Sequence, residues 1–140
     1  MTFELDKVMY DTIKGDASIV ADVSDRISAE YARHTSEYPY LVFDHVSTSV
    51  EPPGFGSASG LLHRALYEIR VVGRWEDGVE DIAKTSDKVV ALFHYSSSES
   101  VTNFDRLVLT VLSGTTVTRA DDELIASVTI QATGNQTTGL

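Results

Sequence analysis

The sequence predicts an α+β fold, in which a mostly antiparallel sheet of four to five strands carries two helices packed on one face. Two segments of the 140-residue chain repeat apolar residues at the spacing of a helix, and others alternate apolar and polar residues as strands do. The order of these segments is helix, strands, long loop, strand, helix, strand and strand. This grouping of helices and strands, without a strict alternation, favours the α+β class.

The first predicted helix has an apolar stripe and a clear end. Apolar residues from Leu5 to Ile13 recur on one helical face, and Gly15 follows as a natural stop. Asp16 is expected to cap a short further turn that carries apolar residues between positions 19 and 23.

The second predicted helix has the stronger stripe, with apolar residues at helical spacing from Val79 to Phe93. Asp77 and Glu80 form a D-x-x-E pattern that resembles a capping box at its start. Trp75 ends the strand before this helix, and we expect its ring to pack in the core.

Strands are predicted where apolar and polar residues alternate, or where β-branched and aromatic residues gather. The strongest is 62–75, in which the odd-numbered residues from Ala65 to Val71 face one way. Asp121 and Asp122 indicate a turn between the last two strands. The predicted strands are residues 26–31, 38–49, 62–75, 106–112 and 123–132.

Length and composition indicate one globular domain. Hydrophobic residues make up 42% of the chain and charged residues 23%, which is ordinary for a globular protein. We expect one α+β domain over residues 1–133 and a flexible C-terminal tail over 134–140. The acidic N-terminus is not expected to be a signal peptide, and no apolar run reaches the ~18 residues of a membrane span. The absence of cysteine excludes disulfides, zinc–thiolate sites and a thiol nucleophile.

The charge argues against nucleic-acid and membrane partners. Twenty-one acidic residues outnumber eleven basic ones, so the net charge is -10. Proteins that bind phosphate backbones need clustered lysine and arginine, and here the basic residues are scattered. An acidic surface also disfavours anionic membranes. Direct binding of DNA, RNA or a membrane is therefore not expected.

No motif indicates catalysis, a cofactor or a metal. Segment 56–60 approaches a nucleophile elbow, but Ala58 stands at its centre in place of serine. Gly54 and Gly56 do not complete a phosphate-binding G-x-G-x-x-G pattern, because Ser59 occupies the position of the third glycine. The four histidines form no H-E-x-x-H pattern. We expect no enzymatic activity, no catalytic residues, no cofactor and no metal.

The segment 51–60 is the longest predicted loop and is rich in glycine, proline and serine. Long ordered loops often carry function. Phe55 has few core contacts available in such a loop, so it either anchors the loop on its own domain or inserts into a partner. The candidate contact residues of this loop are Pro53, Phe55, Ser57 and Ser59.

The order and length of these segments resemble a known family, the tail-terminator proteins of long-tailed bacteriophages, which are also called tail-completion or tail-to-head joining proteins. The resemblance begins with an amphipathic helix, continues through a strand led by Tyr-Pro, and ends with two strands divided by an acidic turn. It covers most of the chain, from about residue 5 to 132, whereas the glycine-rich loop departs from the family pattern. The segments that carry it are Asp16–Val20, Asp25–Ser28, Tyr38–Phe43, Glu68–Arg74 and Ala83–Phe93.

The resemblance implies a virion structural protein at the head–tail junction, assembled in the host cytoplasm. Such proteins form an oligomeric ring, usually a hexamer, that caps the tail tube and stops its polymerisation. The implied partners are further copies of the chain, the tail tube protein and the head connector or stopper protein. Genomic DNA only passes through the lumen, and an acidic lumen would repel its phosphates. The loop residues then become candidate contacts with a neighbouring subunit or the tube.

Other functions stay open at this stage. One is a head–tail connector, an adaptor or another minor tail protein. A second is a small hydrolase with an unrecognised site, and a third is a monomeric binding module. The third would use an exposed sheet face, on which strand 62–75 places Arg64, Arg70 and Arg74.

Overall fold

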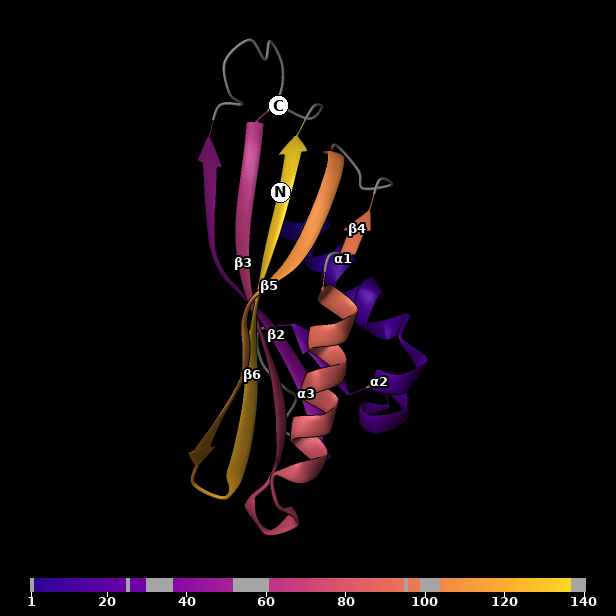
Figure 1. Ribbon diagram of the computed structural model, residues 1–140, viewed down its shortest axis with the longest axis vertical. Helices are drawn as coiled ribbons and strands as arrows, with labels where there is room; N and C mark the ends of the chain where they lie inside the picture. The colour runs from indigo at the N-terminus through magenta and orange to yellow at the C-terminus, as the bar shows by residue number, and fades with distance from the viewer. Residues whose placement is uncertain are drawn as a thin grey trace.

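The computed structural model of the protein is elongated, with a long sheet that has helices on one side (Figure 1). The structure describes residues 2–24, 26–29, 37–51, 61–94, 96–98 and 104–136. Within these ranges, no helix is both long and apolar enough to cross a membrane.

Six strands form one sheet among the described residues, in the order β1-β2-β3-β6-β5-β4. The short pair of β1 and β2 is parallel, and every other neighbouring pair is antiparallel. The predicted α+β class and mostly antiparallel sheet are confirmed. The strands are β1 (Ile27–Ala29), β2 (Tyr40–Glu51), β3 (Leu61–Arg74), β4 (Ser96–Ser98), β5 (Phe104–Ala120) and β6 (Glu123–Gln136).

The sixth strand, β4, is the one that the sequence did not predict. Its three serines carry no apolar alternation, and it forms by pairing with Leu107–Leu109 of β5. A strand of this length owes its conformation to its neighbour and not to its own side chains. The sheet therefore has one strand more than the four to five expected.

The described residues form three α-helices, which pack on the same face of the sheet (Figure 1): α1 (Thr2–Lys14), α2 (Ala17–Val23) and α3 (Glu80–Phe93). Helix α2 is the short turn predicted after Gly15. The Asp16 side chain caps it, as expected, by accepting hydrogen bonds from the backbone N–H groups of Ser18 at 2.9 Å and Ile19 at 3.0 Å.

The core lies between the helices and one face of the two central strands. The odd-numbered residues Ala65 to Val71 of β3 are all buried, as the alternation predicts. Their neighbours on β6 are the even-numbered residues from Ala126 to Ala132, which are buried too. Met9 and Ile13 of α1 close the core from the helix side. None of the described helices lies over the opposite face of the sheet.

The start of α3 differs from the prediction. Trp75–Asp77 form a 3-10 turn, which the Gly78 N–H closes with a 3.2 Å hydrogen bond to the Trp75 carbonyl group. Gly78 has a φ of 81°, a conformation that favours glycine. Helix α3 begins only at Glu80, and no side chain caps it. The predicted capping box is wrong because the tight turn includes Asp77.

The C-terminal end of the ordered domain also differs from the prediction, which placed it at residue 133. Strand β6 continues through Gln136, and Gly134 of the expected tail is buried opposite His63 of β3. The long β3 offers pairing partners to the end of β6, so residues 134–136 belong to the sheet. Residues 137–140 lie outside the described part.

The sheet is long and strongly twisted. Strand β5 has 17 residues, which corresponds to about 55 Å at ~3.3 Å per residue. Because of the twist, β2 is at the left and β5 toward the right at the top of the view in Figure 1, whereas β5 is at the left at the bottom. The β5–β6 turn, the end of β3 and the start of α3 meet at this lower end.

Candidate interaction surface

The sheet face opposite the described helices carries an ionic cluster. Asp44 of β2 lies beside Glu68 of β3 in the register of the two strands. The Arg70 guanidinium group forms an ion pair with the Asp44 carboxylate, and its Nε lies 3.5 Å from Oε1 of Glu68. All three side chains are between 28% and 41% exposed, so the pairs add little stability. The arrangement neutralises the arginine instead of offering it to a ligand.

Two strand edges are free in the described part of the chain. Strand β5 pairs with β4 only at Leu107–Leu109, and strand β2 pairs with β1 only at Leu41–Phe43. Residues 107–118 of β5 contain no charged side chain, and Leu112 and Val117 are exposed there. Natural proteins usually protect a free edge with charges, so an uncharged edge is suited to contact with another chain.

The lower end of the sheet holds a group of aromatic and charged side chains that we call the end cluster. Glu123 is its centre, because Oε2 of this residue accepts hydrogen bonds from the hydroxyl groups of Tyr38 at 2.7 Å and Tyr40 at 3.1 Å. The two tyrosine rings lie 5.6 Å apart. The end cluster consists of Tyr38, Tyr40, Arg74, Trp75, Arg119 and Glu123.

Both tyrosines of the end cluster remain protonated donors near neutral pH. The hydrogen bond to Glu123 is the main cause that raises the pKa of Tyr38, and burial adds to it. Burial raises the pKa of Tyr40 to about 12, with the Glu123 charge and hydrogen bond as further causes. A carboxylate beside a phenol disfavours the phenolate, which explains the direction.

Two arginines lie over aromatic rings of the end cluster. The Arg74 guanidinium group is 5.2 Å from the centroid of the Tyr38 ring, and the Arg119 group is 3.7 Å from that of Trp75. The backbone N–H of Trp75 also donates a 2.7 Å hydrogen bond to the Asp122 carbonyl group. The backbone bond fixes the position of the residue and the Arg119 contact that of its indole, although 49% of the residue is exposed. The predicted core packing of Trp75 is therefore wrong.

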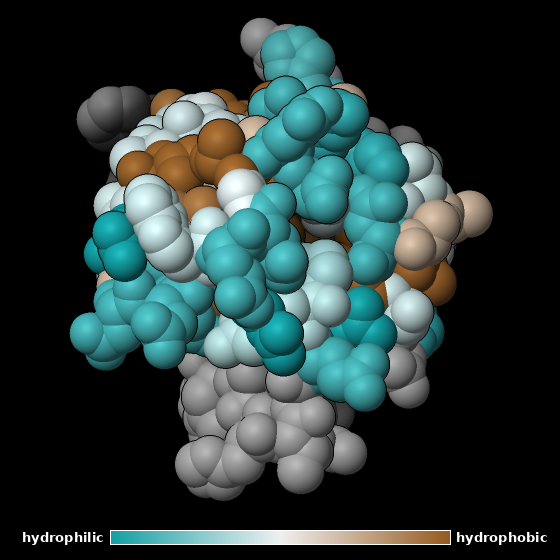
Figure 2. All heavy atoms as spheres, turned by 90° about the horizontal axis from the view of Figure 1, so that it is seen from below, coloured by the Kyte–Doolittle hydropathy of each residue, from teal (hydrophilic) through white to brown (hydrophobic). Residues whose placement is uncertain are grey.

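The reason for this exposure is the position of Trp75 beyond the end of β3. The residue precedes α3, which begins only at Glu80, and the Arg119 guanidinium group lies over its ring. Figure 2 shows that this end of the molecule is mostly hydrophilic, with apolar side chains at the surface in separate patches. A tryptophan that is held in place and half exposed is typical of a contact residue.

A cavity of about 370 Å³ opens within this end of the molecule. Its size falls in the range of pockets that take small ligands or single side chains. Its walls combine two aromatic rings, one guanidinium group and two carboxylates. The lining residues are Tyr38, Arg74, Trp75, Glu76 and Asp122.

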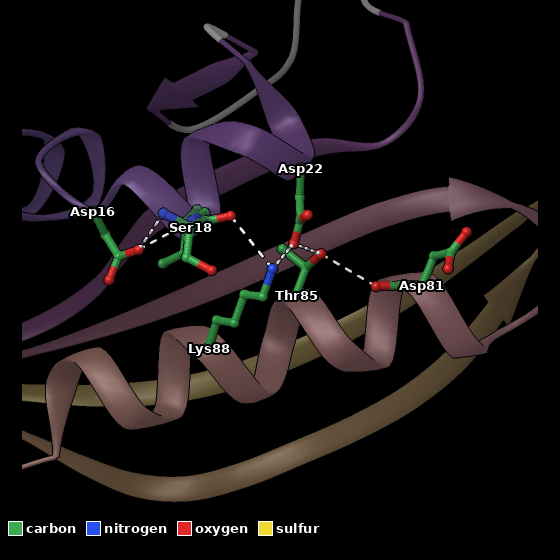
Figure 3. Close-up of polar contacts among 7 residues, drawn as sticks. Asp16, Ser18, Asp22, Asp81, Thr85 and Lys88 are labelled. Carbon is green, nitrogen blue, oxygen red and sulfur yellow. Dashed lines mark hydrogen bonds and ion pairs between the residues drawn. The ribbon is translucent and has the colours of Figure 1, made fainter.

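A second cavity, of about 570 Å³, lies between α2 and α3, but its polar groups satisfy one another. Figure 3 shows Asp22 of α2 pointing toward Thr85 and Lys88 of α3. The Asp22 carboxylate accepts hydrogen bonds from the Thr85 hydroxyl at 2.8 Å and from Nζ of Lys88 at 2.7 Å. Nζ of Lys88 also lies 3.4 Å from the Ser18 carbonyl oxygen. We interpret these contacts as a joint that fixes α2 on α3.

The structure does not describe the contact residues that the sequence predicted. Pro53, Phe55, Ser57 and Ser59 lie outside the described residues. The end cluster was not predicted, although its tyrosines belong to the Tyr-Pro-led strand and Trp75 was singled out. In the described ranges, no three histidine or acidic side chains gather in a way that could hold a metal ion.

Comparisons with known proteins identify the fold. No protein-family model matches the sequence, and no curated protein resembles it in sequence. A solved chain from the virion of a native gene transfer agent particle has a TM-score of 0.68 and 15% identity, with 90% of each chain covered. Another solved chain has a TM-score of 0.51 and 15% identity, covering 89% of this chain and 94% of the other. At such identity the likeness shows a shared fold.

Proposed function

We propose that the protein is a structural component of a phage-like virion that caps the tail tube as an oligomeric ring. In this role it stops tube polymerisation and forms the tail side of the head–tail joint. The observation that carries the proposal is the likeness, over 90% of both chains, to a chain of the gene transfer agent virion. The resemblance of the sequence to tail terminators supports the same role independently.

The surface of the molecule agrees with a role in assembly. Its described part presents two free strand edges, a sheet face that no described helix covers and the end cluster, which are features of contact surfaces and require no covalent chemistry. Different patches on one subunit that meet on its neighbour generate a closed ring when the rotation closes. We propose a hexamer, located at the head–tail junction of the virion.

The partners in this proposal are the tail tube protein and the head connector or stopper protein. The loop between β2 and β3 is the candidate contact with a neighbouring subunit or the tube, through Pro53, Phe55, Ser57 and Ser59. The strand ends that flank it, Glu51 and Leu61, lie at the end of the sheet opposite the end cluster (Figure 1). A subunit with contact surfaces at both ends suits a joint between a tube and a connector.

The proposal is tested by inactivating the gene in its own phage and measuring tail lengths by electron microscopy. We expect overlong tubes that are detached from filled heads. Tails of normal length that fail to attach would instead identify a connector or adaptor. Normal infectious particles would rule out the structural role and leave the enzyme and the monomeric binding module as candidates.

A further inference from the structure

We infer that the end-cluster cavity is a docking site for an arginine or lysine side chain of a different protein. The inference rests on the chemistry of the cavity and not on the proposed tail function. The cavity holds about 370 Å³, enough for one long side chain, and Tyr38 and Trp75 are among its lining residues. Aromatic rings attract cations placed over their faces.

The charges at the cavity favour an incoming cation. The Asp122 carboxylate, which lines the cavity, has no hydrogen bond or ion pair among the described residues. Glu76 has only a 3.5 Å contact with Arg74, and its side chain is 73% exposed. Glu123, which accepts the hydrogen bonds of the two tyrosines, is a further negative charge in the end cluster. A basic side chain would therefore meet an excess of negative charge over the single Arg74 in the cavity wall.

The cations already present leave the Asp122 carboxylate without a partner among the described residues. The guanidinium groups of Arg74 and Arg119 lie over the rings of Tyr38 and Trp75. Nζ of Lys84, the nearby lysine at the start of α3, lies 2.8 Å from Oε1 of Glu80. The cavity thus combines ordered aromatic walls with negative charge that remains available to a partner.

A second copy of this chain is a poor source of the incoming cation. Each copy has a net charge of -10, so two copies repel one another outside any specific contact. Three of the four lysines are ion-paired within the chain: Lys7 with Asp11, Lys84 with Glu80, and Lys88 with Asp22. A different protein with a basic contact face fits the charge of this surface better.

Trp75 is the only tryptophan of the chain, so its fluorescence reports directly on the cavity. The test titrates the purified full-length chain, at low ionic strength, with the capped tripeptide Gly-Arg-Gly and, separately, with capped Gly-Glu-Gly. We expect a saturable change in tryptophan emission with the arginine peptide, and none with the glutamate peptide. Added salt should weaken the response, because the contact is partly ionic.

The matched variants are Asp122→Asn, in the cavity, and Asp11→Asn, which removes the same charge from the exposed surface of α1. We expect Asp122→Asn to raise the Kd for the arginine peptide about threefold to fivefold, the loss typical of one exposed ion pair. Asp11→Asn should leave the Kd unchanged, and circular dichroism checks that both variants fold. Equal responses to both peptides, no response to either, or an unchanged Kd in Asp122→Asn would overturn the inference. Such a failure would leave the tail-length experiment unaffected.

Discussion

The hydroxyl group of Tyr67 donates a 2.7 Å hydrogen bond to Oδ1 of Asp6, and this contact joins the middle of the sheet to α1. Tyr67 is fully buried in the core, where a phenol needs a partner for its polar end. Burial raises the pKa of Tyr67, and the hydrogen bond to Asp6 acts in the same direction. The contact fixes the position of α1 on the sheet as well as adding stability.

Replacing this hydroxyl is expected to destabilise the fold. Tyr67→Phe should lower the free energy of unfolding by about 1–3 kcal/mol, since hydrogen bonds to charged groups contribute roughly this much. The control is Tyr10→Phe, because Tyr10 is 36% exposed on the same helix that carries Asp6. Urea unfolding measures both variants, and equal stability of the two would show that the Tyr67 hydroxyl contributes nothing.

Gly73 is required for the close approach of α3 to β3. A Cβ atom at this position would lie 2.6 Å from Cγ2 of Ile82, a buried side chain with no room to move. Gly73→Ala should lower the free energy of unfolding by about 1–3 kcal/mol, as expected for overpacking. In a double-mutant cycle with Ile82→Ala, the two losses should sum to more than the loss of the double variant. Strict additivity would contradict the steric explanation.

The Asp22–Lys88 joint predicts a stability change in acid. Burial alone would raise the pKa of Asp22, but hydrogen bonds from Lys88 and Thr85 and the Lys88 charge together lower it below 3.8. As the pH falls, the unfolded chain therefore binds the proton before the folded chain does. The Asp22 carboxylate makes its full contribution to folding stability above pH 3.8, and this contribution is lost as the pH falls through the lower pKa of the folded chain. Urea midpoints measured from pH 5 downward should decline less steeply in Asp22→Asn than in the wild type.

The Asp22–Lys88 contact contributes only modestly to the free energy of unfolding at neutral pH. Lys88→Met should cost about 0.5–1 kcal/mol, because its side chain is 36% exposed and pairs of this kind contribute little. The control is Lys84→Met, whose pair with Glu80 is more exposed. A larger loss from Lys84→Met than from Lys88→Met would contradict the role of the joint.

The end cluster predicts a loss of stability in alkali. The pKa of Tyr40 is about 12 in the folded chain and 10 in the ordinary phenol, so the folded state holds its proton longer. Between pH 10 and about 12 the unfolded state loses the proton first, and stability falls as the pH rises. Tyr40→Phe should make the urea midpoint less dependent on pH in this window. An unchanged slope would show that Tyr40 titrates normally.

The loop residue Phe55 is predicted to act in assembly and not in folding. Phe55→Asp should block formation of joined, infectious particles while thermal unfolding of the purified chain stays unchanged. The matched control is Ala91→Asp, which adds the same charge on the exposed side of α3. Normal tail termination by Phe55→Asp would remove the loop from the proposed contacts.

Local patterns were sufficient to predict the long elements. Strand β3 alternates buried residues with exposed or partly buried ones from His63 to Val71, and α3 carries an apolar stripe, so each element shows its period in its own side chains. Strand β4 shows no period and depends on pairing with β5. The exposure of Trp75 could not be predicted either, because the tryptophan follows the last residue of the strand and α3 starts too late to cover it.

The sequence by itself determined the α+β class, the alternation of the central strands and the absence of any thiol chemistry, because each of these depends on residue types at short spacing. Only the tertiary structure decided the end cluster. Tyr38 and Glu123 are 85 residues apart, and they meet because Tyr40 pairs with Val72, which pairs in turn with Ile125. Strand register is a long-range property, set by the shared core face of the whole sheet, and no short segment encodes it alone.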